Sequence, residues 1–330
     1  MHELTIVTGG AGFIGSNIVA ALAERGERVA VCDRLREGEK WRNLAKVTVE
    51  DLVAPETLAG WLAAHVTELT VIVHMGAITA TTELDADLLT EVNFRLPVAL
   101  WRWCASERKR LVYASSAATY GGGEQGFDDD ASASALALLR PLNGYGWSKH
   151  LFDRWIAAEL ARGSARPRQW AGLKFFNVYG PNEYHKGAMQ SVIAHKYPLA
   201  AAGKPVTLFR SERPDVPDGD QKRDFVYVRD CVEVVLWLLD HPNVNGLFNL
   251  GTGEACSFAD LARALCAALG QPARIEYIDM PPAVGVHYQY FTEARMERLR
   301  KAGYTRPFTS LEDGVREYVQ RYLSQPDPYR

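Results

Sequence analysis

Apolar residues form short continuous runs along the first half of the chain, and longer stretches with helical spacing separate these runs. The runs at 4–8 and 28–32 flank a segment, 16–25, whose apolar positions repeat with the period of a helix. Short apolar runs are typical of strands buried on both faces of a parallel sheet. Because strands alternate with helices, the pattern predicts an α/β fold with a Rossmann-type, doubly wound parallel sheet and right-handed crossovers. Further strands are expected at 71–74, 111–114 and 172–176, and helices at 88–107 and 149–161.

The pattern changes after residue 176. Segments become irregular and richer in Pro, Asp and Gly, above all at 210–224, which lies between the strand-like runs VTLF and FVYV. A loop inside a second unit explains this stretch better than a flexible linker. The chain then returns to the first pattern, and two helices with the β-like run RIEYI follow Ser257. We therefore expect interleaved domains: a dinucleotide-binding Rossmann domain of residues 1–176 and 225–251, and a smaller α/β substrate domain of residues 177–224 and 252–330.

The composition is that of an ordinary globular protein. The net charge of −3 and the lack of a basic tract argue against a nucleic-acid partner. The five cysteines are scattered without metal-site spacing, so we expect reduced thiols and no bound metal. The amino-terminal residues lead directly into a strand, and no apolar run approaches membrane-spanning length. These features predict a cytoplasmic protein with no membrane partner, and a homo-oligomer is the expected assembly.

The sequence TGGAGFIG stands between the first strand and the first helix and contains Gly9, Gly12 and Gly15. Glycines in such a turn let the backbone approach a pyrophosphate at the positive end of the helix. The signal is specific because the glycines follow a strand and open a helix. Asp33 ends the second strand, where a carboxylate can bind the hydroxyl groups of an adenosine ribose. We therefore predict a site for a nicotinamide dinucleotide.

Three cations follow this aspartate, namely Arg34, Lys40 and Arg42. A 2′-phosphate needs positive partners, whereas an unshielded aspartate repels it. An aspartate accompanied by several cations favours NADP as the cofactor, and NAD is the alternative.

The sequence YGWSK places Tyr145 and Lys149 four residues apart, on one face of a helix. A tyrosine with an ordinary pKa of about 10 is a poor base at neutral pH. A lysine cation and a positive nicotinamide would both lower that pKa. Such a pair suits proton transfer to and from a hydroxyl group that exchanges a hydride. Ser115 and Ser116 end the strand LVYASS and supply a hydroxyl that can hydrogen-bond the reacting oxygen.

Together these motifs resemble those of the extended short-chain dehydrogenase/reductases that modify nucleotide sugars, the NAD-dependent epimerase/dehydratase family. The resemblance rests on TGGAGFIG, YASSAATYGG, YGWSK and FNVYGP, and it runs along essentially the whole chain. The motifs HKG, KRDFVYV, FNLGTG and YQYFT are similar to those of the family members that invert C6 of an ADP-linked heptose.

The resemblance implies roles for particular residues. Catalytic roles are implied for Ser116, Tyr145, Lys149 and Lys186. Cofactor contacts are implied for Gly9, Gly10, Gly12, Phe13, Ile14, Gly15, Asp33, Arg34, Lys40, Met75, Gly76, Ala77, Ile78, Thr79, Asn93, Lys149, Val178 and Lys186. Substrate contacts are implied for Ser116, Asn177, Ala188, His195, Phe209, Arg210, Ser211, Glu212, Arg223 and Tyr288. Three features depart from the family pattern: Ala188 replaces a serine, Arg34 replaces an asparagine, and the loop 213–221 is longer.

Lys186, in the sequence NEYHKGAM, admits two roles. The family's reaction implies oxidation of C6 to a ketone, rotation of the side chain and return of the hydride to the opposite face. The two epimers direct their hydroxyl groups differently, so a second proton-transfer group beside Tyr145 makes physical sense, and Lys186 can serve if burial lowers its pKa. Alternatively, Lys186 binds a substrate phosphate as a point charge. The residues alone leave both roles open, and the resemblance favours the acid/base role.

The implied activity interconverts ADP-D-glycero-D-manno-heptose and ADP-L-glycero-D-manno-heptose through a transient 6-keto intermediate, supplying heptose for the lipopolysaccharide core. A UDP-sugar 4-epimerase is the main alternative, since it shares the Ser/Tyr/Lys set but has no obvious use for Lys186. A 4,6-dehydratase would need a carboxylate pair just after Ser116, and residues 117–119 contain none. A non-catalytic NADP-binding regulator is disfavoured because Ser116, Tyr145 and Lys149 are all present.

Overall fold

The computed structural model describes residues 3–281 and 288–330, and its main sheet has seven strands. All neighbouring strands in this sheet run parallel, in the order β10-β6-β5-β4-β1-β2-β3. Every residue of β1, β6 and β10 is buried, as expected for strands with helices on both faces. The predicted Rossmann-type fold is confirmed. The strands are β1 (Leu4–Thr8), β2 (Arg28–Cys32), β3 (Asp51–Val53), β4 (Leu69–His74), β5 (Arg110–Ser116), β6 (Gln169–Phe175) and β10 (Gly246–Leu250).

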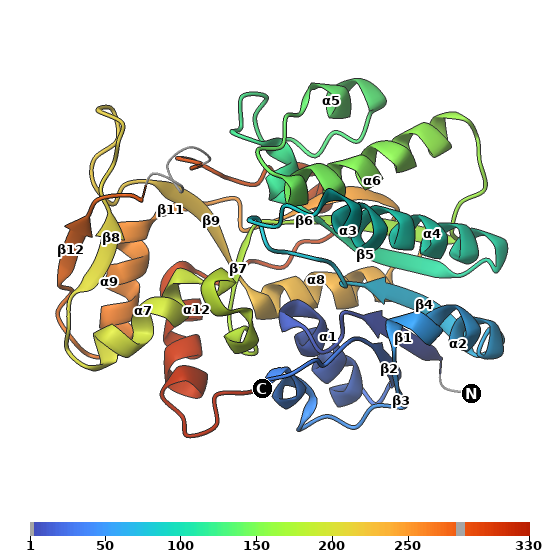
Figure 1. The fold of residues 1–330 in the computed structure, drawn as a ribbon, viewed down its shortest axis with the longest axis horizontal. Helices are drawn as coiled ribbons and strands as arrows, with labels where there is room; N and C mark the ends of the chain where they lie inside the picture. The colour runs from blue at the N-terminus through green and yellow to red at the C-terminus, as the bar shows by residue number, and fades with distance from the viewer. Residues whose placement is uncertain (1–2, 282–287) are drawn as a thin grey trace.

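Helices cover both faces of the main sheet (Figure 1). Helices α1 (Phe13–Glu24) and α8 (Val228–Asp240) pack against each other on one face, whereas α4 (Leu96–Ser106) and α6 (Gly144–Ala161) lie on the other. Helix α1 begins at Phe13, before the predicted start at Ser16, because the glycine turn feeds directly into its first turn. Among the described residues, no helix is both long enough and apolar enough to cross a membrane.

The predicted single helix 88–107 is wrong in detail. The segment consists of α3 (Ala86–Thr90), the π-helical segment η3 (Glu91–Arg95) and α4. Pro97 stands in the first turn of α4 and has no backbone N–H, so the hydrogen-bond register changes just before it. Single π turns inside helices occur frequently at functional sites, and the residue at the middle of this one, Asn93, reaches the cavity wall described below.

A second region holds two smaller sheets and its own hydrophobic cluster. Strands β7 (Asn177–Tyr179), β9 (Lys222–Tyr227) and β11 (Ala255–Ser257) form one sheet, and β8 (Val206–Phe209) pairs with β12 (Ile275–Ile278) in the other. The cluster beneath them includes Tyr179, Leu265 and Tyr318. Helices α7 (Val192–Ala201), α9 (Phe258–Ala268) and α12 (Leu311–Tyr318) surround it.

The expectation of two helices after Ser257 is wrong. The described part of the chain contains α11 (Glu297–Lys301) there in addition to α9 and α12. Leu299 of α11 belongs to the hydrophobic core of the main sheet, and α11 packs against β10. The chain therefore passes between the two cores several times. The exact domain boundaries stay a prediction.

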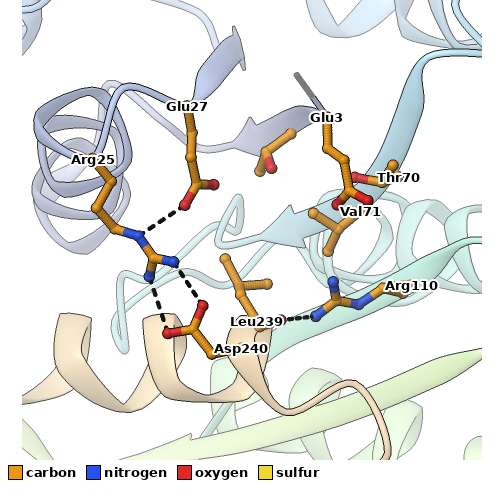
Figure 2. Close-up of a pocket in the computed structure, with 9 residues that line it drawn as sticks. Glu3, Arg25, Glu27, Thr70, Val71, Arg110, Leu239 and Asp240 are labelled. Carbon is orange, nitrogen blue, oxygen red and sulfur yellow. Dashed lines mark hydrogen bonds and ion pairs between the residues drawn. The ribbon is translucent and has the colours of Figure 1, made fainter. Parts of the chain in front are cut away.

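A cavity of about 260 Å³ lies at the amino end of the main sheet, and one of the charged side chains that line it, Arg25, pairs with two carboxylates (Figure 2). The Arg25 guanidinium lies 2.9 Å from the Glu27 carboxylate and 2.6 Å from that of Asp240. Arg110 donates to the backbone carbonyl of Leu239. These contacts tie the end of α1 and the start of β5 to the end of α8.

Candidate functional site

The turn between β1 and α1 is built from glycines that hold backbone close to backbone. Gly9 has a φ of +67°, and a Cβ there would lie 2.5 Å from the backbone nitrogen of Gly76. A Cβ on Gly15 would overlap the carbonyl oxygen of Gly9. Gly12 caps α1 without a side-chain hydrogen bond, so the first amides of the helix have no side-chain acceptor. The turn therefore presents backbone N–H groups and the positive end of a helix, which fits a pyrophosphate.

A cavity of about 220 Å³ opens beside this turn, where β1, β4, β5 and β6 end. The carboxyl ends of parallel strands are where open α/β sheets bind ligands. Ala114, Ser115, Phe175 and His185 form part of its lining. The predicted site residues that line it are Gly9, Gly12, Phe13, Ile14, Gly15, Asp33, Lys40, Met75, Gly76, Ala77, Thr79, Tyr145, Lys149 and Lys186.

Asp33 and Lys40 lie together at one end of this cavity. The Asp33 carboxylate accepts hydrogen bonds from the Ala11 amide at 2.9 Å and from Lys40 Nζ at 2.6 Å. Lys40 also donates to the carbonyl oxygen of Arg34 at 3.1 Å. The Arg34 guanidinium, by contrast, pairs with Glu56 and is half exposed. The structure thus brings Lys40 to the cavity and directs Arg34 away from it.

Asn93 holds one wall of the cavity in place. Its side chain accepts from the Ile78 amide and donates to the Ile78 carbonyl, both at 2.9 Å, and it donates to Ser148 on α6 at 3.0 Å. The π turn thereby joins the segment after β4 to the helix that carries Tyr145. Two other predicted cofactor residues lie outside the lining: Gly10 packs against Val31, and Val178 pairs with β9.

Helix α6 carries Tyr145 and Lys149 to the cavity, and its first turn is capped by Asn143, which accepts from the Gly146 amide at 2.8 Å. Lys149 Nζ donates to the carbonyl oxygen of Ala114 at 2.8 Å. Burial lowers the pKa of Lys149 to about 8, although the Asp153 carboxylate opposes that change. Burial raises the pKa of Tyr145, and a hydrogen bond with Ser116 opposes the rise.

A buried network of charged and polar side chains links α6, which carries Tyr145 and Lys149, to β5 and β6. Asp153, one further turn along α6, accepts from Ser115 at 2.7 Å and from Lys174 of β6 at 2.8 Å. Lys174 also donates to Thr119 at 2.6 Å, and Thr119 donates to the Ser116 carbonyl at 2.8 Å. The network joins β5, β6 and α6 immediately behind Ser116.

Lys186 lines the same cavity from a different element, the segment η5 (Tyr184–Met189). Its Nζ lies 5.4 Å from the centre of the Phe13 ring. Burial lowers the pKa of Lys186, and the Glu183 carboxylate opposes that change. His185 beside it lies 3.2 Å from the Asn43 side chain, and burial lowers the pKa of His185 to about 4. A neutral imidazole and a lysine that loses its proton more easily than usual thus face the cavity together.

A second cavity of about 190 Å³ lies in the second region. Of the predicted substrate residues, Phe209 and Tyr288 line it. The buried Arg223 guanidinium lies between the rings of Phe258 and Tyr288, at 5.6 and 5.1 Å from their centres. The remaining lining residues are Val192, Lys196, Thr207, Leu208, Gln221 and Phe258. A mostly apolar pocket with an adjacent cation suits a nucleotide base attached to phosphates.

The other predicted substrate residues lie around these two cavities. Ala188 and His195 meet at the start of α7, where the His195 ring lies 3.3 Å from the Ala188 carbonyl. Asn177 is exposed in β7. Beyond Phe209, Arg210 pairs with Asp218 and Asp279, while Ser211 and Glu212 use their backbone amides to bond Asp218 and Tyr290. The Arg210 side chain is therefore held by two ion pairs, and the backbone of Ser211 and Glu212 is held by hydrogen bonds.

Residues 5–251 match the NAD dependent epimerase/dehydratase family. The chain belongs to this family. The resemblance predicted from the motifs is confirmed, and the glycine turn, the Tyr145–Lys149 pair and the cavity between them are the parts of the molecule that carry it.

The chain is similar over nearly its full length to ADP-L-glycero-D-manno-heptose-6-epimerases. It is 50% identical to that of Nitratidesulfovibrio vulgaris (strain DP4), over 98% of this chain and 99% of the relative. It is 44% identical to that of Fusobacterium nucleatum, over 99% and 100%. The crystal structure of the Helicobacter pylori ADP-L-glycero-D-manno-heptose-6-epimerase superposes with a TM-score of 0.79 at 26% identity, covering 98% of this chain and 97% of that one. A Thermus thermophilus UDP-glucose 4-epimerase complex with NAD superposes with 0.75 at 28%, covering 98% and 99%.

Sequence reasoning did not assign His185, Ala114 or Phe175 to the site. His185 follows Tyr184 in an irregular segment, and only its position beside Lys186 in the HKG motif could have indicated it. Ala114 and Phe175 look like ordinary apolar strand residues in the sequence. Nothing in their residue type distinguishes a strand residue that lines a cavity from one in the core. Asp153 and Lys174 were missed as well, because their pairing is made between separate elements.

Proposed function

We propose that this protein interconverts ADP-D-glycero-D-manno-heptose and ADP-L-glycero-D-manno-heptose through a transient 6-keto sugar, with the L-epimer serving lipopolysaccharide core synthesis. The observation that carries the proposal is that one cavity is lined by Tyr145 and Lys149 of α6 together with Lys186 of η5. The names of the full-length relatives support the same substrate.

The residues of the glycine turn fit a nicotinamide dinucleotide, which when bound accepts a hydride from the substrate carbon and returns it. The uncapped end of α1 would hold its pyrophosphate, and Asp33 with Lys40 would hold its adenosine ribose. NADP is the proposed cofactor because Lys40 lines the cavity and its charge shields Asp33 from a 2′-phosphate. Arg34 contributes less, since Glu56 already neutralises it.

Tyr145 and Lys186 are the proposed proton-transfer groups for the two epimers. Tyr145 exchanges a proton between its hydroxyl and the C6 oxygen, and the Lys149 cation lowers the pKa of that hydroxyl when both line the occupied cavity. Ser116 hydrogen-bonds the same oxygen. Lys186 exchanges the proton of the epimer whose hydroxyl points the other way, and its lowered pKa suits that role.

The second cavity is the proposed site of the adenine base, with Arg223 on the diphosphate. A guanidinium held between two aromatic rings is fixed in direction, so it can present two parallel donors to a phosphate. Asn177, Ala188 and His195 lie close in sequence to residues that line the two cavities and would contact the heptose. Phe209 to Glu212 would border the base, and Ala188 would leave more space beside the heptose than the family's serine.

The deciding experiment incubates the purified protein with ADP-D-glycero-D-manno-heptose and follows C6 by NMR. We expect an equilibrium mixture of the two epimers. In D₂O the product should carry no carbon-bound deuterium at C6, because the hydride stays on the cofactor between the two transfers. Turnover of UDP-galactose without turnover of the ADP-heptose would instead assign a UDP-sugar 4-epimerase. Deuterium at C6 would exclude the 6-keto route.

A further inference from the structure

Residues 324–330, here called the tail segment, leave the second region and return to the main sheet beside α1 (Figure 1). Such segments are usually poorly tied down unless specific contacts hold them. Here Tyr329 is buried, with 7% of its surface exposed. The tail segment is therefore built into the fold.

One side of the tail segment contacts the elements that form the dinucleotide turn. Arg330 pairs with Glu24 of α1 at 2.9 Å and donates to the carbonyl of Asn17 at 3.2 Å. Lys46 donates to the Tyr329 carbonyl at 2.7 Å. The Arg42 guanidinium lies 4.4 Å from the centre of the Tyr329 ring. These contacts fasten the tail segment to α1 and to the segment that includes Lys40.

The other side contacts the segment that carries Lys186. Tyr184 donates its hydroxyl hydrogen bond to the Pro328 carbonyl at 2.8 Å, and its ring meets the Tyr329 ring edge-on, with 5.1 Å between centres. The Arg330 amide donates to the Asn182 side chain at 3.0 Å. The tail segment thus touches the residues on the amino-terminal side of Lys186 but has no recorded contact with Lys186 itself among the described residues.

The loop that begins at Asn182 and leads to Lys186 is also linked by hydrogen bonds to the dinucleotide turn and to α1. Asn182 is fully buried with a φ of +74°, donates to Ser16 at 3.0 Å, and accepts on its carbonyl from Asn43 at 3.0 Å. The Asn43 side chain also reaches the Ala11 carbonyl at 2.9 Å and the His185 ring at 3.2 Å. The loop at Asn182 is therefore hydrogen-bonded to α1 and, through Asn43, to the dinucleotide turn, and the tail segment contacts the same loop through Arg330.

We propose that the tail segment is a brace that sets the position of Lys186 relative to the dinucleotide turn, with Tyr329 and Arg330 as positioning residues. The proposal rests on the proposed function, in which Lys186 transfers a proton at C6. Within the described residues Lys186 has no ion-pair partner, so the backbone of its loop and the Phe13 ring determine where its Nζ lies. Proton transfer needs heavy atoms within hydrogen-bond reach, and a displacement of about 1 Å lowers a rate by roughly 100-fold.

Tyr329→Ala is the primary test, carried out on the full chain with ADP-D-glycero-D-manno-heptose as substrate. We expect kcat to fall by about 10-fold or more, with KM changed by less than about threefold, because substrate contacts lie elsewhere. Tyr329→Phe should retain near-normal kcat, since the ring, rather than the hydroxyl, contacts Tyr184 and Arg42. Phe308→Ala is the matched control: Phe308 also lies beneath an arginine, Arg300, at 5.1 Å, but packs on the main-sheet core, and its loss should leave kcat unchanged.

A second, milder variant tests the same contact in case the Tyr329→Ala protein does not fold. Tyr184→Phe keeps the ring and removes the hydroxyl, which bonds Pro328 and Tyr318, and it should lower kcat by a few fold at unchanged KM. In a Lys186→Met background, Tyr329→Ala should cause no further loss, since two changes that act through one group are not additive. Unchanged kcat in both Tyr329→Ala and Tyr184→Phe, or equal losses with and without Lys186, would overturn the brace. A wild-type protein that does not turn over ADP-heptose would instead overturn the proposed function.

Discussion

The two ends of the main sheet each hold a cavity lined by charged side chains, and the charges are handled in opposite ways. At the amino end, the Arg25 guanidinium pairs with the carboxylates of Glu27 and Asp240 (Figure 2). At the carboxyl end, Lys149 and Lys186 line the cavity without a salt bridge to any described residue. Burying a cation without an opposite charge is unfavourable, and proteins retain such groups mainly where they act on a ligand.

Charge pairing separates a structural cavity from a functional one better than size does. The two cavities are of similar size, at about 260 Å³ and about 220 Å³. At the amino end the Arg25 guanidinium has two carboxylate partners and Arg110 donates to the Leu239 carbonyl, so these cations are already satisfied within the protein. The carboxyl-end cavity leaves helix amides, a phenol and two lysines for a ligand to satisfy.

The largest effects should come from the unpaired groups at the carboxyl end. Tyr145→Phe and Lys186→Met should each lower the rate of epimerisation by about 10²–10⁴-fold, because each removes one of two required proton-transfer groups. Both variants should still bind ADP-sugar, measured by calorimetry. Lys204→Met, at an exposed lysine, is the control and should retain full activity. Near-normal turnover of Lys186→Met with much weaker ADP-sugar binding would make Lys186 a phosphate clamp.

Among the described residues, Lys40 is the one lysine lining the carboxyl-end cavity that has a carboxylate partner, and it tests the choice of cofactor. Lys40→Ala should weaken NADP binding by about 10-fold relative to NAD, since it removes the positive charge that faces the ribose. Arg34→Asn should change that preference less, because Glu56 already holds Arg34. Fluorescence titration with both nucleotides measures the ratio. Equal affinities in the wild type, or a larger effect of Arg34→Asn, would contradict the assignment.

The pH dependence of stability should reveal the lowered pKa of Lys149, which has no salt bridge to a described residue. Its pKa of about 8 lies below the ordinary value of 10.5, so between these pH values the unfolded chain binds a proton that the folded protein lacks. The free energy of unfolding should therefore rise with pH across this window, by up to about 1.4 kcal/mol per pH unit. Urea titrations of cofactor-free protein at pH 8 and pH 10 give the slope. The Lys149→Met variant should show a flatter slope, and an identical one would contradict the shift.

The smallest effect should come from the amino end. Arg25→Ala should leave the rate of epimerisation unchanged and lower the free energy of unfolding by about 1 kcal/mol or less, because its pairs are partly exposed. Thermal and urea unfolding measure this loss. A marked fall in activity would show that the two ends of the sheet are coupled.

Local patterns predicted much of the fold and the centre of the site. The glycine turn and the Tyr145–Lys149 pair each consist of residues close together in sequence. Once the strand and the helix form, this spacing alone brings the residues together, so the sequence was enough to predict them. The residues around Lys186 left its role open between proton transfer and phosphate binding, and the resemblance favoured proton transfer. The π turn at Asn93 was missed because the apolar spacing continues through it, although Pro97 could have indicated a change.

Contacts between distant segments could not be predicted from local patterns. Arg34 was expected beside the ribose, but the position of Glu56 after β3 draws its side chain away. Lys174 reads as a polar interruption of a buried strand until Asp153 is placed beside it. The contacts of Tyr329 with Arg42 and Tyr184 likewise depend on how the chain returns to α1.

The pairing of β6 with β10 has a consequence for how the protein is made on the ribosome. β6 is buried along its whole length in the finished sheet, yet its partner strand β10 follows only after β7, β8, β9 and α8, with Ala171 facing Gly246. Until residue 250 has emerged, an apolar strand edge stays open to pairing with other chains. The nascent protein should therefore depend on chaperones during that interval, and slow translation between 176 and 246 should increase its aggregation.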